Sequence, residues 1–215
     1  MPTRVKICGI TRLEDAQLAV ERGASALGFN FYAPSPRYIE PSAARNIVLE
    51  VPPFVTSVGV YADETDLANV LERAGMAGVG CVQLHGQSHQ VLDDVRQVLP
   101  VIVAVGVGAA FNPQSLSTMN ASAFLLDASH PELHGGTGKT FDWEIAKEAG
   151  RYGTIILAGG LTPENVGQAI RKVRPYAVDV ASGVESAPGI KDSGKLKAFF
   201  QAVKETDREL ETVVH

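Results

Sequence analysis

A cysteine that could do chemistry lies at the end of the first apolar segment of the chain. Residues 4–8 read RVKIC, in which two β-branched residues alternate with Lys6 and Cys8, and this pattern predicts a β-strand. Gly9 then ends the strand, and residues 11–14 have the Thr-x-x-Glu spacing of a helix capping box. Cys8 therefore occupies the passage from a strand to a helix, where parallel α/β proteins bind ligands. Its thiol is either catalytic or a small buried hydrophobe.

Polar residues follow several later apolar segments in the same manner. Each has an ordinary structural interpretation: Asp127 can cap a turn, His85 can be a surface histidine, and Arg37 can be an exposed charge. The loop that carries Arg37 is stiffened by two prolines, however, which suits a preset contact with an anion. Cys81 lies two residues before Gln83, so its side chain shares a strand face with Gln83 but lies deeper in the protein, which indicates a packing role. The candidates at these strand ends are Arg37, Gln83, His85 and Asp127.

Glycine-containing loops follow the last two apolar segments. Gly159 and Gly160 come after one of them, and Ser182 and Gly183 come after the other. Glycine lets the backbone approach phosphate oxygens closely, and barrel proteins commonly build a phosphate site from the loops after their seventh and eighth strands. Because both loops carry the feature, we interpret them as a phosphate site rather than as ordinary turns.

Lys6 shares a strand face with Cys8 and lies one layer lower. It is therefore expected to point into the protein interior, where an ammonium group needs a carboxylate partner. Asp179, on the eighth segment, is the candidate partner. A buried lysine could instead form a Schiff base with a carbonyl substrate, and this alternative stays open at the level of the sequence.

The composition is that of an ordinary globular protein. The chain has 215 residues, of which 45% are hydrophobic and 20% are charged, with a net charge of −5. The absence of a basic run argues against nucleic acid or an anionic membrane as a partner. Two distant cysteines fit a reducing cytoplasm, and no segment approaches the ~18 apolar residues of a membrane span. No residue cluster has the spacing of a metal site.

Short apolar runs alternate with helical patterns along the whole chain. The repeat has the length of a βα unit and occurs eight times without interruption, which predicts a single-domain closed (β/α)8 TIM barrel over residues 1–215. The rival is an open doubly wound sheet, but that fold usually has about five or six strands and a Gly-x-Gly-x-x-Gly turn, which is absent here. The predicted strands are residues 4–8, 26–31, 55–60, 79–86 (the fourth strand with its exit), 101–107, 123–127, 154–158 and 177–180.

Helical periodicity recurs between the strands. Apolar side chains at i, i+3, i+4 and i+7 predict one buried face on each helix. Thr162 and Pro163 are of the types expected at the N-cap and at the first position of a helix. The predicted helices lie at about residues 12–22, from 42, 67–74, 91–98, 113–119, from 142, 163–173 and 196–203, and residues 206–215 extend the last one or fray.

Several motifs, in order along about residues 4–204, resemble those of the phosphoribosylanthranilate isomerase family. Singly they are weak, but together they are very specific. They are KICGIT at residues 6–11, SPRY at 35–38, QLHG at 83–86, LD at 126–127, GGTG at 135–138 followed by FDW at 141–143, AGGL at 158–161 and DVASGVE at 179–185.

The resemblance implies an Amadori rearrangement in tryptophan biosynthesis, in which N-(5-phosphoribosyl)anthranilate becomes a 1-deoxyribulose 5-phosphate. It implies that Asp127 is the general acid and Cys8 the general base, and that Arg37 pairs with the anthranilate carboxylate. No cofactor or metal is implied, and the partner is this phosphorylated small molecule, bound by a monomer or homodimer. The remaining implied roles are phosphate binding by Gly159, Gly160, Ser182 and Gly183, a ribose contact by Asp179, further substrate contacts by Gln83 and His85, and closure by the loop at 135–140.

That mechanism requires a thiolate at Cys8 beside a protonated Asp127. We therefore expect the site to lower the pKa of Cys8 from its ordinary value of about 8.5, with help from the helix that begins after Gly9.

Overall fold

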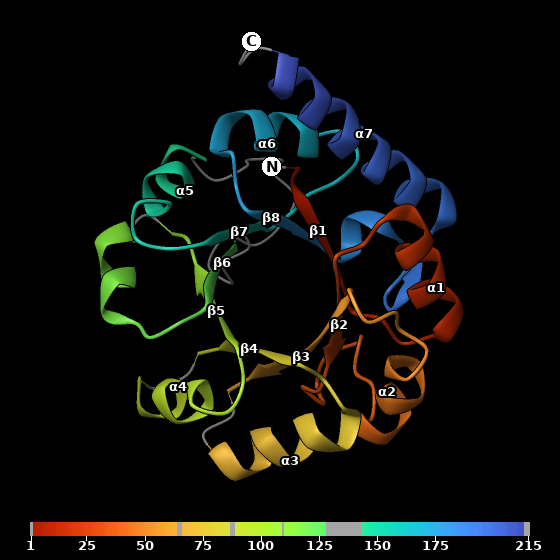
Figure 1. Cartoon of the computed structure of the whole chain (residues 1–215), viewed down its shortest axis with the longest axis vertical. Helices are drawn as coiled ribbons and strands as arrows, with labels where there is room; N and C mark the ends of the chain where they lie inside the picture. The colour runs from red at the N-terminus through yellow and green to blue at the C-terminus, as the bar shows by residue number, and fades with distance from the viewer. Residues whose placement is uncertain (1, 64–65, 87–88, 109, 128–142, 213–215) are drawn as a thin grey trace.

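Eight parallel strands form a closed barrel in chain order, and β1 pairs with β8 to complete it. The computed structural model describes residues 2–63, 66–86, 89–108, 110–127 and 143–212. Figure 1 shows the strands around the middle of the molecule and the helices outside them. The predicted TIM barrel is confirmed, and the open sheet is excluded. The strands are β1 (Arg4–Cys8), β2 (Ala26–Asn30), β3 (Thr56–Ala62), β4 (Cys81–His85), β5 (Val101–Gly106), β6 (Ala123–Asp127), β7 (Ile155–Ala158) and β8 (Ala177–Val180).

Helices connect the strands, except that a 3-10 helix, η1 (Pro113–Thr118), stands between β5 and β6. After β8 the chain makes a second short 3-10 helix, η2 (Ser182–Val184), and then an antiparallel hairpin of β9 (Glu185–Ala187) and β10 (Ile190–Lys191). The α-helices are α1 (Leu13–Arg22), α2 (Pro41–Val48), α3 (Leu67–Ala77), α4 (His89–Arg96), α5 (Trp143–Ala149), α6 (Val166–Val173) and α7 (Ser193–Thr212).

The alternation of side chains along each strand separates two apolar regions. Outward residues pack against the helices in one large core. Inward residues form a smaller cluster inside the barrel, made of Val58, Cys81, Ile102, Ala123, Leu125, Ile156, Ala158 and Ala177. The same inward alternation carries the polar side chains Lys6, Cys8, Gln83, His85, Asp127 and Asp179. The strands therefore aim the candidate residues into the barrel, and Cys81 packs there as expected.

The capping box predicted at residues 11–14 is wrong. Helix α1 begins at Leu13, and its N-cap residue, Arg12, makes no side-chain cap. The Thr11 hydroxyl donates instead to the carbonyl oxygen of Gly189 at 2.6 Å. The Thr11 hydroxyl, which the local pattern assigned to the helix cap, thus contacts the β9–β10 hairpin instead.

Two other local expectations differ from the structure. Helix α6 begins at Val166 with Asn165 as its N-cap residue, so it starts later than Pro163 predicts. The Thr162 hydroxyl still accepts a hydrogen bond from the backbone N–H of Glu164 at 3.3 Å, within the turn that leads into the helix. Val98 lies beyond the end of α4 and is 62% exposed, so it does not belong to a buried helix face.

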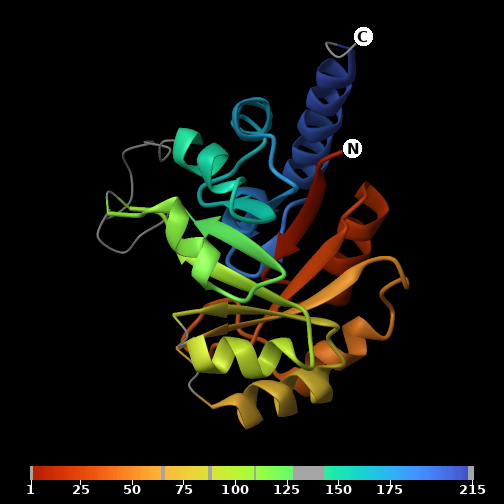
Figure 2. The same ribbon diagram turned by 60° about the vertical axis from the view of Figure 1, so that its left-hand side comes forward.

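Helix α7 brings the two ends of the described chain together. The backbone N–H and the hydroxyl of Thr3 donate to the carboxylate of Asp207 at 2.8 and 2.6 Å. Figure 2 shows the N-terminal segment beside this helix. The helix runs to Thr212, so the tail extends it as one of the two expected outcomes. Within the described residues, no helix is both long and apolar enough to cross a membrane.

Candidate active site

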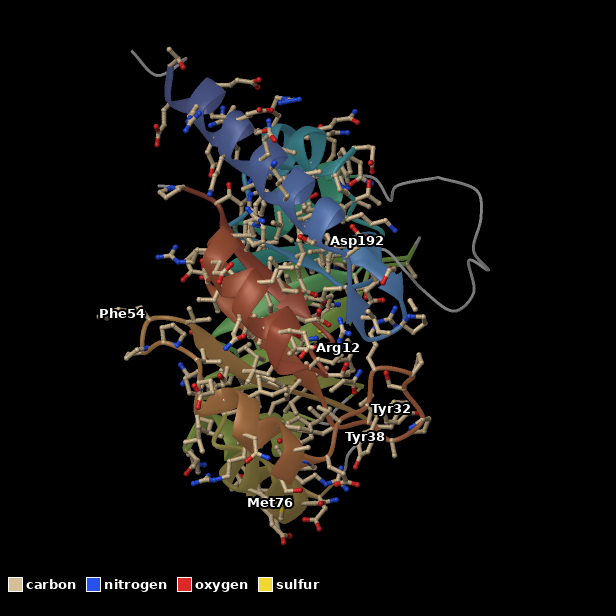
Figure 3. All side chains as sticks on the ribbon, turned by 90° about the vertical axis from the view of Figure 1, so that its right-hand side faces the viewer. Arg12, Tyr32, Tyr38, Phe54, Met76 and Asp192 are labelled. Atoms are coloured by element: carbon tan, nitrogen blue, oxygen red, sulfur yellow. The ribbon has the colours of Figure 1, made fainter. Side chains whose placement is uncertain are left out.

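The candidate residues gather at the end of the barrel where the strands finish. In Figure 3, Tyr32 and Tyr38, from the loop after β2, lie on the right-hand side of the molecule, at one end of the barrel, and Phe54, from the loop before β3, lies on the left-hand side, at the other end. The strands run from the Phe54 end to the tyrosine end. Cys8 and Asp127, the last residues of β1 and β6, therefore face the same mouth.

Gly28 makes room for the thiol of Cys8 beside the ammonium of Lys6. The two strands pair Cys8 with Gly28. A Cβ atom at Gly28 would lie 2.9 Å from Sγ of Cys8 and 3.1 Å from Nζ of Lys6. The bare α-carbon of Gly28 thus leaves a space where these two groups approach each other.

Lys6 forms the predicted ion pair with Asp179. Nζ of Lys6 lies 2.7 Å from Oδ1 of Asp179, and both residues are buried. Burial opposes the charge on Lys6, but the attraction of Asp179, with a further contribution from Cys8, outweighs it and raises the pKa of Lys6. Lys6 is therefore a stable ammonium, which disfavours the Schiff-base alternative because that chemistry needs a neutral amine.

The pKa of Cys8 is raised, so the expectation of a lowered value is wrong. Burial is the main cause, and Asp179 adds to it. Lys6 and Lys191 act in the opposite direction but do not overcome the loss of solvent. Helix α1 begins only at Leu13, and a helix terminus acts mainly on groups within its first turn. The surroundings of Cys8 therefore favour the neutral thiol over the thiolate.

Gln83 and His85 lie on the inward face of β4 and contact each other. Nε2 of Gln83 is 2.8 Å from Nε2 of His85. Burial lowers the pKa of His85, although the charge of Asp127 acts against this. Within the described part of the chain, the buried Oε1 of Gln83 has no hydrogen-bond donor. The pair thus presents a neutral imidazole and one unsatisfied acceptor to the barrel interior.

Arg37 is held in place by a bonded loop and a distant acid. Nδ2 of Asn30 donates to Oγ of Ser35 at 3.0 Å, and the same Oγ accepts from the backbone N–H of Arg37 at 3.2 Å. The guanidinium donates to Glu185 from Nε at 2.9 Å and from Nη2 at 2.7 Å. Arg37 is therefore an anchored cation rather than a freely exposed charge, and its bond to Glu185 raises its pKa.

The loops after β7 and β8 touch each other through their backbones. A Cβ atom at Gly183 would overlap the carbonyl oxygen of Leu161 and lie 3.2 Å from Cα of Thr162. Gly159 and Gly160 both adopt left-handed conformations, with φ of 84° and 64°. The loops after β7 and β8 thus form one joint corner of the mouth.

A sequence model described as N-(5'phosphoribosyl)anthranilate (PRA) isomerase matches residues 5–202. The chain belongs to this family. It is 48% identical to the N-(5'-phosphoribosyl)anthranilate isomerase of Pelobacter propionicus, over 96% of this chain and 98% of that protein. The crystal structure of the Thermus thermophilus phosphoribosyl anthranilate isomerase matches with a TM-score of 0.86 and 41% identity, covering 94% and 99% of the two chains.

A further solved PRA isomerase holds reduced 1-(o-carboxyphenylamino)-1-deoxyribulose 5-phosphate. It is 42% identical to this chain, with a TM-score of 0.82, and the match covers 94% of this chain and 99% of that one. The ligand of that relative carries a phosphate and a carboxyphenyl group on a reduced deoxyribulose chain. A site for such a molecule must hold two separate anionic groups.

Three residues at this end of the barrel were not among the candidates from the sequence: Asn30, Glu185 and Lys191. Glu185 closes the last family motif, and Lys191 follows a Pro-Gly turn shortly after it. Two opposite charges flanking that turn were the available signal. The predicted loop at residues 135–140 lies outside the described residues. In the described ranges, no group of three or more His, Cys, Asp or Glu side chains is arranged to hold a metal ion.

Proposed function

We propose that this chain converts N-(5'-phosphoribosyl)anthranilate to 1-(o-carboxyphenylamino)-1-deoxyribulose 5-phosphate in tryptophan biosynthesis, with Cys8 as general base and Asp127 as general acid. Membership of the isomerase family supports the reaction. The observation that carries the residue assignment is that β1 and β6 end at the same mouth in an inward-facing thiol and an inward-facing carboxyl group. The carboxyl group would donate a proton and the deprotonated thiol would remove one, which is what an aldose–ketose rearrangement needs.

In the first step, Asp127 gives a proton to the ring oxygen of the ribose. The bond between that oxygen and C1′ breaks, and the nitrogen lone pair forms a protonated imine at C1′. In the second step, Cys8 removes the proton from C2′, which leaves an enolamine. Protonation at C1′ and loss of the hydroxyl proton at C2′ give the ketone. Only protons and electron pairs within the substrate move, so the proposed reaction requires no cofactor.

The second step needs a thiolate, although burial favours the thiol form of Cys8. Each pKa unit above the working pH costs about 1.4 kcal/mol. Lys6 supplies the compensating charge, because its ammonium lies next to Sγ in the space left by Gly28. The thiolate is thus a minor species that Lys6 stabilises once it forms.

Binding is divided among separate groups around the mouth. The loops at Gly159–Gly160 and Ser182–Gly183 would hold the phosphate through backbone N–H groups. Arg37 would bind the anthranilate carboxylate. Because Glu185 occupies Nε and Nη2, the carboxylate would meet the Nη1 side of the guanidinium.

The remaining substrate contacts involve three inward side chains. Oδ2 of Asp179 would accept a hydrogen bond from a ribose hydroxyl, while Oδ1 keeps its ion pair with Lys6. The unsatisfied Oε1 of Gln83 would accept a hydrogen bond from a second ribose hydroxyl, and His85 would lie beside that hydroxyl. The partner is the phosphorylated substrate, and the cytoplasm, where both free cysteines stay reduced, is the proposed location.

The test is a turnover assay in which the labile substrate is generated in place and the fluorescence of its anthranilate group is followed. The wild-type protein is expected to change that fluorescence, whereas Cys8→Ser and Asp127→Asn are expected to lose activity by about 10²–10⁴-fold. Both variants should still bind reduced 1-(o-carboxyphenylamino)-1-deoxyribulose 5-phosphate. A wild-type protein without turnover, or an Asp127→Asn variant with normal kcat, would contradict the proposal.

A further inference from the structure

Three charged side chains, two of them buried and one half-buried, form a cluster at the mouth, here called the Arg37 cluster. Glu185 stands between the two cations: Oε2 lies 2.7 Å from Nη2 of Arg37, and Oε1 lies 2.7 Å from Nζ of Lys191. The cluster joins the loop after β2 to the hairpin after β8, across 148 residues of sequence. It contains two positive charges and one negative charge, so one positive charge is left over.

The burial of the cluster is graded. The side chain of Lys191 is 0% exposed and that of Glu185 is 4% exposed, whereas that of Arg37 is 23% exposed. The excess positive charge therefore reaches solvent through Arg37, at the mouth. Despite burial, the hydrogen bonds from Arg37 and Lys191 keep the pKa of Glu185 below its usual range.

The cluster also touches the strand end that carries the thiol. Nζ of Lys191 donates to the backbone carbonyl oxygen of Cys8 at 2.6 Å. A Cβ atom at Gly9 would lie only 2.6 Å from Cδ of Arg37, so the arginine side chain crosses directly over that residue. Arg37 is thus fixed by Glu185 on one side and by the backbone after Cys8 on another.

Holding the hairpin in place does not account for these charges. The hairpin is already bonded to the start of α1 by the Thr11 hydroxyl on the Gly189 carbonyl at 2.6 Å and by the Lys191 backbone N–H on Asp15 at 3.1 Å. Replacing buried ion pairs by apolar side chains is often neutral or stabilising, so stability alone is a weak reason for them. What the charges do specify is the direction of the guanidinium, because Glu185 bonds two nitrogens of its plane.

We propose that Glu185 is a positioning residue that fixes the guanidinium of Arg37 for the carboxylate of the substrate, and that Lys191 holds Glu185 in place for this purpose. The inference rests on the proposed function, in which Arg37 binds that carboxylate. Glu185 does not touch the substrate. It turns the Nη1 side of Arg37 toward the ligand and prevents the side chain from swinging into solvent.

The experiment compares two ligands, reduced 1-(o-carboxyphenylamino)-1-deoxyribulose 5-phosphate and the same molecule without its carboxyl group. Affinities are measured for wild type, Arg37→Ala, Glu185→Gln and the double variant. Arg37→Ala is expected to weaken binding of the carboxylated ligand by about 10-fold or more, and Glu185→Gln by a similar order. Neither change should alter binding of the other ligand by more than about 2-fold. In the Arg37→Ala background, Glu185→Gln should have no further effect, because its action passes through Arg37.

Controls separate positioning from general damage. Glu209→Gln removes an ion pair with Arg171 of 2.9 Å on the outer helices and should leave both affinities unchanged. Glu185→Gln leaves the buried Lys191 and the half-buried Arg37 without their acid, so circular dichroism and thermal unfolding must show a folded protein. If that variant unfolds, the double change Glu185→Gln and Lys191→Met removes one of those cations and carries the same expectation for binding.

The outcomes distinguish this inference from the proposed function. An Arg37→Ala protein with unchanged affinity for the carboxylated ligand would remove Arg37 from the substrate site and contradict the proposed function. A normal loss in Arg37→Ala, together with a Glu185→Gln protein that binds both ligands as wild type does, would overturn only the positioning role. If Glu185→Gln instead lost the same amount of affinity for both ligands, the positioning role would also be overturned, because that result would indicate a structural role.

Discussion

Nζ of Lys6 lies 2.7 Å from Oδ1 of Asp179, in an ion pair that bridges the first and last strands of the barrel one layer below Cys8. The register of β1 and β8 places the two residues directly opposite each other. The same ammonium approaches Sγ of Cys8, so one cation serves both a buried carboxylate and the proposed base. Barrel closure and the electrostatics of the thiol therefore depend on the same side chain.

The first prediction concerns the strength of this pair. Asp179→Ala leaves Lys6 buried without a counter-charge, and we expect the free energy of unfolding to fall by about 3–5 kcal/mol. Urea denaturation gives this value directly. Glu209→Gln, which breaks an exposed pair, is the matched control and should lose at most about 1 kcal/mol. Equal losses in the two variants would show that the buried Lys6–Asp179 pair contributes no more to the free energy of unfolding than an exposed pair does.

The second prediction concerns the protonation of Cys8. Because burial raises its pKa, the rate of alkylation by iodoacetamide should rise with pH through a midpoint above the ordinary thiol value of about 8.5. Lys6 acts to lower that pKa, so Lys6→Met should move the midpoint to still higher pH. The measurement is made in a Cys81→Ala background, although burial already raises the pKa of Cys81 to about 11. A midpoint at or below about 8.5 would contradict the structural explanation.

The architecture and part of the site follow from sequence because they depend on periodic patterns. Alternation along residues 4–8 places Lys6 and Cys8 on one face, and the count of βα units places Asp179 on the neighbouring strand, so their meeting could be predicted. Asp127 is likewise fixed by being the last residue of a strand.

The missing parts depend on contacts that no local pattern records. Glu185 finds Arg37 only because the hairpin after β8 folds back over the loop after β2. The Thr11 hydroxyl serves Gly189 rather than its own helix for the same reason. The direction of the Cys8 pKa was also beyond sequence, since it depends on whether burial outweighs two lysines, and that balance is set by three-dimensional packing.

The third prediction distinguishes the two mechanisms that the sequence left open, proton removal by Cys8 and a Schiff base on Lys6. Cys8→Ser should lower kcat by about 10²–10⁴-fold with little change in KM, because serine is a far weaker acid and supplies no comparable base. Cys81→Ser, which alters the other buried thiol, is the control and should keep its kcat. Borohydride treatment in the presence of substrate should not attach ligand to Lys6. Covalent trapping there would revive the Schiff-base mechanism.

The fourth prediction concerns the corner where the loops after β7 and β8 meet. Gly183→Ala introduces a Cβ atom that overlaps the carbonyl oxygen of Leu161, which is backbone and has no rotamer by which to move away. The two loops must then separate, and we expect a loss of about 1–3 kcal/mol in stability, the usual range for overpacking. If these loops bind the phosphate, KM should rise and inhibition by inorganic phosphate should weaken, while the substrate carboxylate still meets Arg37. The measurements are steady-state kinetics and phosphate inhibition on the folded variant.

Gly80→Ala is the matched control for this change. A Cβ atom at Gly80 would meet nothing within 4 Å, and the residue lies before β4, away from the mouth. Its stability should stay within about 1 kcal/mol of wild type, with unchanged KM and phosphate inhibition. The decisive comparison is between ligands: Gly183→Ala should weaken phosphate itself, whereas Arg37→Ala should not, because the carboxylate and the phosphate are held by separate groups. If Gly183→Ala is destabilised but inhibited by phosphate as wild type is, the contact between the two loops is structural, and the phosphate must bind elsewhere.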